Sequence, residues 1–175
     1  MKLNSSLQLA PHALDAEKVE RANTRDGYGH GLVEAGRADE KVVVLCADLT
    51  ESTRSEWFAK EFPNRFVQMG VAEQNMATVA SGIAATGKTV FISSYATFSP
   101  GRNNEQIRTT ISYNSWGAKA GKEISVKIAG AHAGISVGPD GATHQALEDV
   151  ALMRVQPGMV VIVPTDVHEA QRATI

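Results

Sequence analysis

The sequence predicts an α/β fold in which a doubly wound, mostly parallel sheet carries helices on both faces, giving three layers. Two observations predict this fold. Short, nearly continuous apolar segments recur along the chain, and the stretches between them carry apolar residues at helical spacing. Strands that are apolar on both sides are buried on both faces, and parallel strands need crossover helices to connect them. The chain has 175 residues, 43% of them hydrophobic, which is enough for one domain with a full core.

Five apolar segments have the length of buried strands and are followed by turn or capping residues. They cover residues 42–46, 66–69, 90–93, 124–129 and 160–163. The clearest helix begins at Glu73 and is expected to stop at Gly87. Its apolar positions, which repeat at helical spacing, are Met76, Val79, Ala80 and Ile83. Further helical segments span residues 27–36, 106–113, 145–154 and 167–174.

Charge and apolar patterning argue against several classes of partner. The chain has 17 Lys and Arg residues against 19 Asp and Glu residues and no basic stripe, so nucleic acid is not an expected partner. No segment approaches the ~20 apolar residues of a membrane span. The single cysteine, Cys46, lies in an apolar segment, which fits a reducing, cytoplasmic location. Residues 1–14 are expected to be an unstructured lead-in to a domain that spans residues 15–175.

Polar residues gather after four of the predicted strands. These exits cover residues 48–54, 70–75, 94–105 and 132–144. Ligands of an open parallel sheet bind beyond the carboxyl ends of its strands, so the sequence predicts a site there. No glycine occurs at residues 47–52, which argues against a dinucleotide site, and neither compact metal-ligand spacing nor a nucleophile elbow is present.

Glu73 has two interpretations on local sequence alone. It is either a first-turn acid that complements the helix dipole or a functional carboxylate. Its neighbours favour the second interpretation, because residues 70–76 (GVAEQNM) closely match the segment that carries an essential glutamate in transketolase.

Three further segments extend this match. Residues 94–108, with the sequence SYATF at their start and EQIR at their end, resemble the pyrimidine pocket of the transketolase family, and residues 130–145 resemble its substrate loop. Residues 24–25 and 47–52 also match, so the similarity runs in family order from about residue 23 to the end. The chain therefore resembles the pyrimidine-binding domain of transketolase.

The resemblance implies a thiamine diphosphate site. Glu73 would bond the pyrimidine nitrogen opposite the bridge to the thiazolium ring and favour the tautomer that removes the thiazolium proton, which requires a buried carboxyl in an apolar pocket. The implied cofactor-binding residues are Glu73, Tyr95, Phe98, Asp48 and Arg102. Three of them have ordinary alternatives, because Tyr95 and Phe98 could pack at the sheet edge and Asp48 could cap a helix. One more residue separates Phe98 from Arg102 than in some relatives.

The resemblance also implies sugar-phosphate substrates. The implied substrate-binding residues are Arg25, Ser52, His132, Asp140 and His144. His132 and His144 join Glu73 as the expected catalytic residues, since histidine can donate to an oxyanion and accept a hydroxyl proton near neutral pH. An exposed solvated arginine is the alternative for Arg25. The reaction implied is transfer of a two-carbon ketol unit from a ketose phosphate to an aldose phosphate.

The motif that holds Mg²⁺ and the cofactor's diphosphate in this family is missing. Residues 139–141 (PDG) lack both the first glycine of Gly-Asp-Gly and the later asparagine, so no metal site is expected in this chain. The resemblance implies that another domain or subunit holds Mg²⁺ and the diphosphate. We therefore expect a fragment or a subunit of a split enzyme, without diphosphate-binding and C-terminal domains, inactive alone and active in a homo- or hetero-oligomer.

Other interpretations remain within and outside the superfamily. Deoxyxylulose-phosphate synthase and the beta chain of a 2-oxo-acid dehydrogenase are enzymatic alternatives, although His132, Asp140, His144 and residues 48–50 favour transketolase. A non-catalytic regulatory or assembly module of the same fold is a third possibility. The presence of Glu73 and both loop histidines argues against it.

Overall fold

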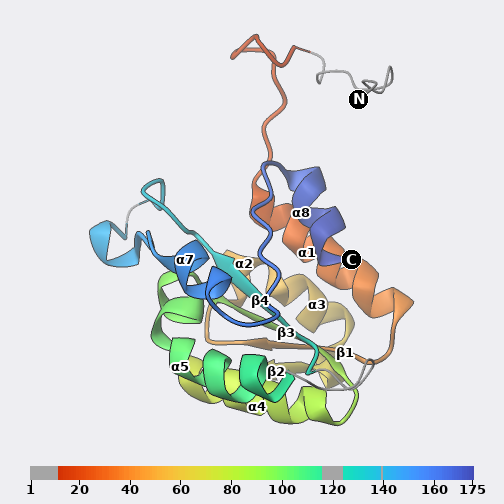
Figure 1. The fold of residues 1–175 in the computed structure, drawn as a ribbon. Coiled ribbons are helices and arrows are strands. Elements are labelled where there is room, and N and C mark those ends of the chain that lie inside the picture. The colour runs from red at the N-terminus through yellow and green to blue at the C-terminus, as the bar shows by residue number, and fades with distance from the viewer. Residues whose placement is uncertain (1–11, 116–123, 139) are drawn as a thin grey trace, which may run out of the picture.

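The computed structural model describes residues 12–115, 124–138 and 140–175. Its centre is a four-stranded parallel sheet in the order β2-β1-β3-β4 (Figure 1). The strands are β1 (Val42–Cys46), β2 (Phe66–Gln68), β3 (Thr89–Tyr95) and β4 (Val126–Ala131). In the register, Cys46 of β1 pairs with Ser93 of β3, and Tyr95 of β3 pairs with Ala131 of β4. All four strands therefore end at the same edge of the sheet.

Helices cover both faces of this sheet, as the sequence predicts (Figure 1). One face carries α1 (Thr24–Ala38), α3 (Ser55–Glu61) and, packed on α1, α8 (Val167–Thr174). The other carries α4 (Glu73–Ala85) and a helical stretch made of α5 (Asn104–Gln106), η3 (Ile107–Ser112) and α6 (Tyr113–Ser115). The remaining short elements are α2 (Thr50–Thr53), η1 (Pro63–Arg65), η2 (Thr97–Arg102), η4 (Ala142–His144) and α7 (Asp149–Arg154).

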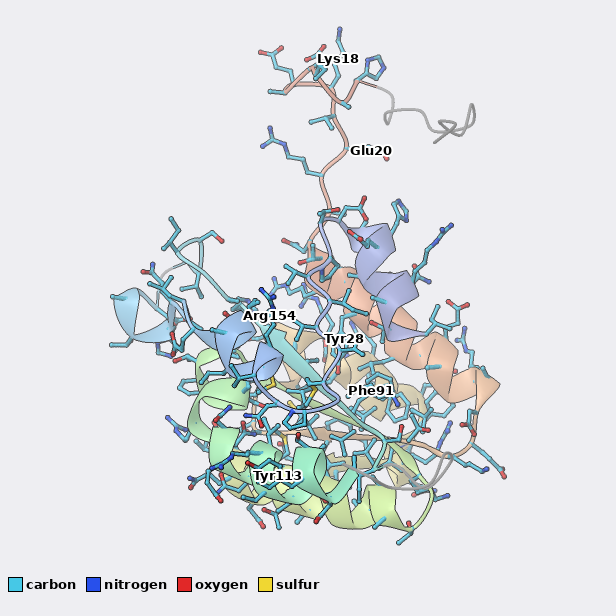
Figure 2. All side chains as sticks on the ribbon, in the orientation of Figure 1. Lys18, Glu20, Tyr28, Phe91, Tyr113 and Arg154 are labelled. Atoms are coloured by element: carbon cyan, nitrogen blue, oxygen red, sulfur yellow. The ribbon has the colours of Figure 1, made fainter. Side chains whose placement is uncertain are left out.

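Alternate strand residues enter two separate cores. Leu45 and Ile92 face α4 and η3, where Met76 of α4 and Ile107 of η3 are completely buried. Val44 and Phe91 point the opposite way, toward α1 and α3. Tyr28 of α1 packs against this second core, and Figure 2 shows Tyr28 and Phe91 close together between α1 and the sheet. Burial on both faces is what the nearly continuous apolar strands require, and it confirms the predicted fold class.

Glycines allow α8 to lie directly on α1. A Cβ atom at Gly27 would lie 2.0 Å from the carbonyl oxygen of Val167, and one at Gly31 would lie 2.6 Å from Cβ of Thr174. Neither distance is compatible with a side chain, so the two backbones can approach this closely only where α1 has no Cβ. The close contact explains why α1 contains Gly27 and Gly31, although glycine has a low helix propensity.

The fifth predicted strand, at residues 160–163, is wrong for this structure. The segment belongs to no ladder, and Val160, Ile162 and Val163 are 80, 59 and 67% exposed. It lines, together with residues of β4, a cavity of about 720 Å³. β-branched residues favour a pleated, half-buried surface, but this preference alone does not make a strand. Residues 160–163 form no ladder with any described strand.

Helix boundaries differ from prediction mainly where the helices are short. Residues 106–113 are divided among α5, η3 and α6, and the helix predicted at 145–154 begins only at Asp149. Two helices next to the site, α2 and α3, were not predicted, because the polar residues after β1 resemble a loop. Within the described residues, no helix is both long and apolar enough to cross a membrane.

Candidate functional site

The predicted site residues lie in the loops that follow the four parallel strands. Asp48 and Ser52 follow β1, Glu73 begins α4 after β2, Phe98 and Arg102 follow β3, and His132 follows β4. The edge formed by the carboxyl ends of parallel strands is the usual ligand site of such sheets. Segments that are far apart in sequence therefore contribute to one region.

The carboxylate of Glu73 is buried and paired with an arginine. The residue is only 2% exposed, although it is the first residue of a helix. Arg102 Nη1 donates to Glu73 Oε2 at 2.9 Å. The expected apolar pocket therefore also contains a guanidinium, whose positive charge compensates the burial of the carboxylate. Within the described residues no hydrogen bond engages Oε1, so this oxygen remains available to a ligand.

Arg102 also covers the aromatic ring of Phe98. Its Cζ atom lies 4.5 Å from the ring centroid, within the range of a cation–π contact. The Arg102 side chain is 47% exposed, so it is much less enclosed than Glu73. The guanidinium thus links the carboxylate of Glu73 to the face of Phe98.

Four rings from two strand exits pack together beside this pair. Tyr95 and Phe98 are nearly parallel, with an interplanar angle of 7° and centroids 6.2 Å apart. His132 lies 4.3 Å from Tyr95, and His144 meets the edge of Phe98 at 5.3 Å. Both predicted histidines therefore contact the predicted aromatic residues. Rings that combine an apolar face with a polar atom suit a partly enclosed site.

His132 has a strained backbone and an unpaired nitrogen. Its φ angle is 55°, in the left-handed region that residues other than glycine rarely adopt. Its Nδ1 atom is buried and has no hydrogen-bond partner among the described residues. Burial lowers the pKa of His132, and the positive charge of Arg25 lowers it further, whereas Asp140 acts in the opposite direction. The imidazole is therefore held mainly neutral at pH 7, with a nitrogen ready to bond a ligand.

The remaining predicted residues are held by main-chain contacts. Arg25 Nη1 donates to the carbonyl oxygen of Ser52 at 3.2 Å, so it fixes the loop after β1 and not the Ser52 hydroxyl. Asp48 has a φ angle of 60°, and its N–H donates to Gln68 Oε1 at 2.9 Å. The alternative role of a helix cap does not apply to Asp48, because Leu49 is the N-cap of α2 and makes no side-chain capping bond.

A family model described as the pyrimidine-binding domain of transketolase matches residues 20–175. This chain belongs to that family. A "Putative transketolase C-terminal section" from Methanocaldococcus jannaschii is 51% identical over 147 residues, which cover 84% of this chain and 44% of that protein. Human transketolase is 37% identical over 163 residues, covering 92% of this chain and 25% of that protein. A 6-deoxy-6-sulfo-D-fructose transketolase subunit from a Clostridium species is 36% identical over 156 residues, covering 89% of this chain and 46% of that protein.

A solved structure described as "Split gene transketolase, inactive beta4 tetramer" has the same fold. It is 46% identical, has a TM-score of 0.73, and the match covers 89% of this chain and 47% of that chain. The transketolase pyrimidine-binding domain described here spans less than half the length of the curated relatives that it matches.

The residues of this transketolase domain fit an aminopyrimidine ring. A buried carboxylate oxygen can accept or share a proton with a ring nitrogen, and two aromatic side chains provide apolar contact. Ser94 Oγ and His132 Nδ1 are buried polar atoms without partners in the described residues, as expected beside a polar ligand. No group of three or more His, Cys, Asp or Glu side chains that could hold a metal ion occurs in the described ranges.

Sequence reasoning missed three polar residues of this region. Asn103 bonds the main chain of Glu73, Ser94 lies one residue before the end of β3 with an unpaired hydroxyl, and Gln68 holds the loop after β1. Asn103 lies among polar residues, whereas Ser94 and Gln68 lie in strands whose other residues are mostly apolar. Only the fold shows which atoms these side chains reach, so the sequence offered no signal to find them.

Proposed function

We propose that this chain is the pyrimidine-binding part of a thiamine-diphosphate-dependent transketolase. It would transfer a two-carbon ketol unit from a ketose phosphate to an aldose phosphate, together with a domain or subunit that binds the diphosphate. Membership of the family and the buried carboxylate of Glu73 beside Phe98, Tyr95 and His132 support this proposal. The observation that carries it is the burial of Glu73 at the carboxyl edge of the sheet.

The side chains of the proposed site would bind and orient the cofactor and exclude water from it. When bound, thiamine diphosphate supplies an electron sink for making and breaking a carbon–carbon bond beside a carbonyl. Glu73 would hold the pyrimidine nitrogen through Oε1 while Arg102 remains on Oε2. Phe98 and Tyr95 would exclude water from that hydrogen bond, which strengthens it because the local dielectric is low.

The two histidines would act on the sugar. His132 is held neutral by its surroundings and can donate a hydrogen bond to a developing oxyanion or accept a hydroxyl proton. His144 Nδ1 is hydrogen-bonded to Thr143 Oγ1 at 2.9 Å, which leaves Nε2 for the substrate. Asp140 would bind a sugar hydroxyl. Arg25 uses one donor on Ser52 O and keeps others for a sugar phosphate.

A partner that holds the diphosphate follows from the proposed site. A cofactor that lies between two domains has only one wall of its cleft in this chain. One relative is described as a C-terminal section, another as a subunit, and a similar structure as an inactive tetramer of a split-gene enzyme. We infer a hetero-oligomer in the reducing cytoplasm, in which the partner binds the diphosphate through Mg²⁺ and this chain alone is inactive.

The test combines the chain with a candidate diphosphate-binding subunit, thiamine diphosphate and Mg²⁺. Ketol transfer is measured with fructose 6-phosphate and with 6-deoxy-6-sulfofructose as donors, since one relative is named for the latter. We expect Glu73→Gln to reduce kcat by at least about 10²-fold, because the carboxylate acts in proton transfer, while Glu40→Gln, an exposed control, leaves kcat unchanged.

Two results would contradict the proposal. One is full activity of Glu73→Gln in the assembled enzyme. The other is a preference for a 2-oxo acid as donor, which would point to deoxyxylulose-phosphate synthase or a 2-oxo-acid dehydrogenase.

A further inference from the structure

Asn103 is a fully buried amide that contacts the residue at the centre of the proposed site. It is 0% exposed, and its Nδ2 donates to the main-chain oxygen of Glu73 at 3.1 Å and to Ser99 Oγ at 3.1 Å. Its Oδ1 is buried and has no partner among the described residues. Asn103 thus joins the start of α4 to the loop after β3 from inside the protein.

The first turn of α4 lacks the usual restraint. Its N-cap residue, Ala72, has no side chain that could cap the helix, and no capping bond is formed. Arg102 holds the carboxylate of Glu73, but its side chain is nearly half exposed and therefore a loose restraint. The bond from Asn103 restrains the main chain of the same residue and is shielded from water. Two consecutive residues of one loop therefore hold Glu73, one by its carboxylate and one by its backbone.

We propose that Asn103 is a positioning residue, which fixes the first residue of α4 so that the carboxylate of Glu73 stays in place beside Phe98. The hydrogen bond from Asn103 to the main chain of Glu73 is part of the structure. The identity of the ligand that the carboxylate binds rests on the proposed function. Small displacements are sufficient to disturb a hydrogen bond between a carboxylate and a ring nitrogen, so a fixed backbone at this point benefits binding.

Asn103 is poorly suited to stabilising the fold. The unpartnered, buried Oδ1 costs free energy, which offsets much of what the two bonds of Nδ2 contribute, so replacement by leucine is expected to change the stability little. A residue that served only to stabilise the fold would lower the melting temperature when replaced by leucine, together with every other property. A positioning residue would leave the melting temperature unchanged or raise it, and would disturb Glu73 selectively.

The first experiment needs no cofactor. Asn103→Leu is compared with the unaltered chain and with Ser99→Ala, which removes the other acceptor of Asn103 Nδ2 but keeps the bond to Glu73. We expect Asn103→Leu to melt no lower than the unaltered chain and a crystal structure to show Glu73 Oε2 displaced from Arg102 Nη1, a distance that is now 2.9 Å. The amide of Met76, which bonds Ala72 O in the first turn, should exchange at least about tenfold faster. Ser99→Ala should show neither change.

The second experiment measures what the position of Glu73 does for binding. Two ligands are titrated into the chain assembled with its diphosphate-binding partner. One is thiamine diphosphate, and the other is an analogue with carbon in place of the pyrimidine nitrogen that Glu73 would bond. The unaltered protein should prefer thiamine diphosphate by about tenfold or more, as expected for a charge-assisted bond. Glu73→Gln should abolish this preference, and Asn103→Leu should reduce it at least about threefold.

The outcomes separate the two proposals. Unchanged positions of Glu73 and Arg102 in Asn103→Leu overturn the role of Asn103, whatever the cofactor does. A lower melting temperature of Asn103→Leu, together with an equal loss of affinity for thiamine diphosphate and for the analogue, overturns it as well. Absence of any preference in the unaltered protein contradicts the proposed function alone, because the crystal structure and amide exchange still decide the role of Asn103.

Discussion

At the scale of single residues, the site is defined by what surrounds one carboxylate. Glu73 is buried, bonded by Arg102 at its carboxylate and by Asn103 at its main chain. The ring of Phe98 lies under the guanidinium, so the ion pair has an apolar neighbour on one side. Such a pair is stabilising only while the arginine is present, because the carboxylate of Glu73 alone would be buried without compensation.

The environment of His132 predicts how it titrates. Burial and the nearby charge of Arg25 lower the pKa of His132, and Asp140 opposes them. We expect the pKa of His132 to rise in Arg25→Met and to fall further in Asp140→Asn, as measured by NMR titration of its ring protons. Arg21→Met removes an exposed charge on the segment before α1 and is the matched control. An unchanged His132 titration in both variants would contradict this electrostatic account.

The same shift makes stability depend on pH. The unfolded chain binds a proton at His132 near its reference pKa of about 6.5, whereas the folded chain binds it only at lower pH. As pH falls below that value, the unfolded state holds more protons, so the folded state loses stability until the folded pKa is passed. We expect urea unfolding to show a smaller loss between pH 7 and 5 in His132→Asn. Asparagine suits the left-handed backbone at this position, so the variant should fold.

The structure shows that residues predicted to share a site are near one another, while their roles stay a prediction. A carboxylate, two histidines and two aromatic residues that the sequence assigned to one region do lie together in space. The partner of Glu73 could not be predicted, because the ion pair depends on how the loop after β3 folds back over α4. The contact between Arg25 and the carbonyl of Ser52 was equally invisible, since main-chain acceptors carry no signal in the sequence.

At the scale of elements, the contact between α1 and α8 depends on missing side chains. Gly27 and Gly31 leave no room for a Cβ atom against Val167 and Thr174. We expect Gly27→Ala and Gly31→Ala each to destabilise the protein by about 1–3 kcal/mol, the usual cost of overpacking. Chemical denaturation followed by circular dichroism measures this change.

Gly82 provides the matched control for these variants. It lies in α4, and a Cβ atom added there would meet no atom within 4 Å beyond its own stretch of helix. Gly82→Ala should therefore stabilise the protein by about 0.5–1 kcal/mol. Equal effects at Gly82 and Gly27 would show that helix propensity, and not the close contact with α8, decides the outcome.

Elements were predicted best where the apolar pattern was long or fully buried. The segments at residues 42–46 and 90–93 and the helix at Glu73 agree closely with β1, β3 and α4. Residues 160–163 have the same composition as a buried strand, but a strand needs a neighbour as well as a propensity. The short helices α2 and α3 escaped prediction because fewer than eight residues cannot display a clear helical period.

At the scale of the whole molecule, the proposed site would form one wall of a cleft whose other wall belongs to a partner. The proposed cofactor residues lie at the carboxyl edge of the sheet, and exposed apolar side chains such as Val71, Ile135 and Leu147 belong to the loops around them. Apolar surface of this kind is typical of a face that meets another protein.

A strong dependence of cofactor affinity on the partner is therefore expected. We predict that the chain alone binds thiamine diphosphate weakly and that the diphosphate-binding subunit with Mg²⁺ increases the affinity at least about 100-fold, since the diphosphate contributes most of the charge-based contacts. Isothermal titration calorimetry of the chain, of the partner and of their mixture measures this difference. Equal affinity of the isolated chain and the mixture would contradict the two-wall arrangement.

The pairing of the edge strands has a consequence for how the site is lost during unfolding. Within the described sheet, β2 is bonded only to β1 and β4 only to β3, while β1 and β3 each have two neighbours. A strand held on one side opens at lower cost than the strands inside the sheet. Opening at the β4 margin would displace His132, and opening at the β2 margin would disturb the start of α4 at Glu73, so mild warming or denaturant should loosen the proposed site before the central strands β1 and β3 separate.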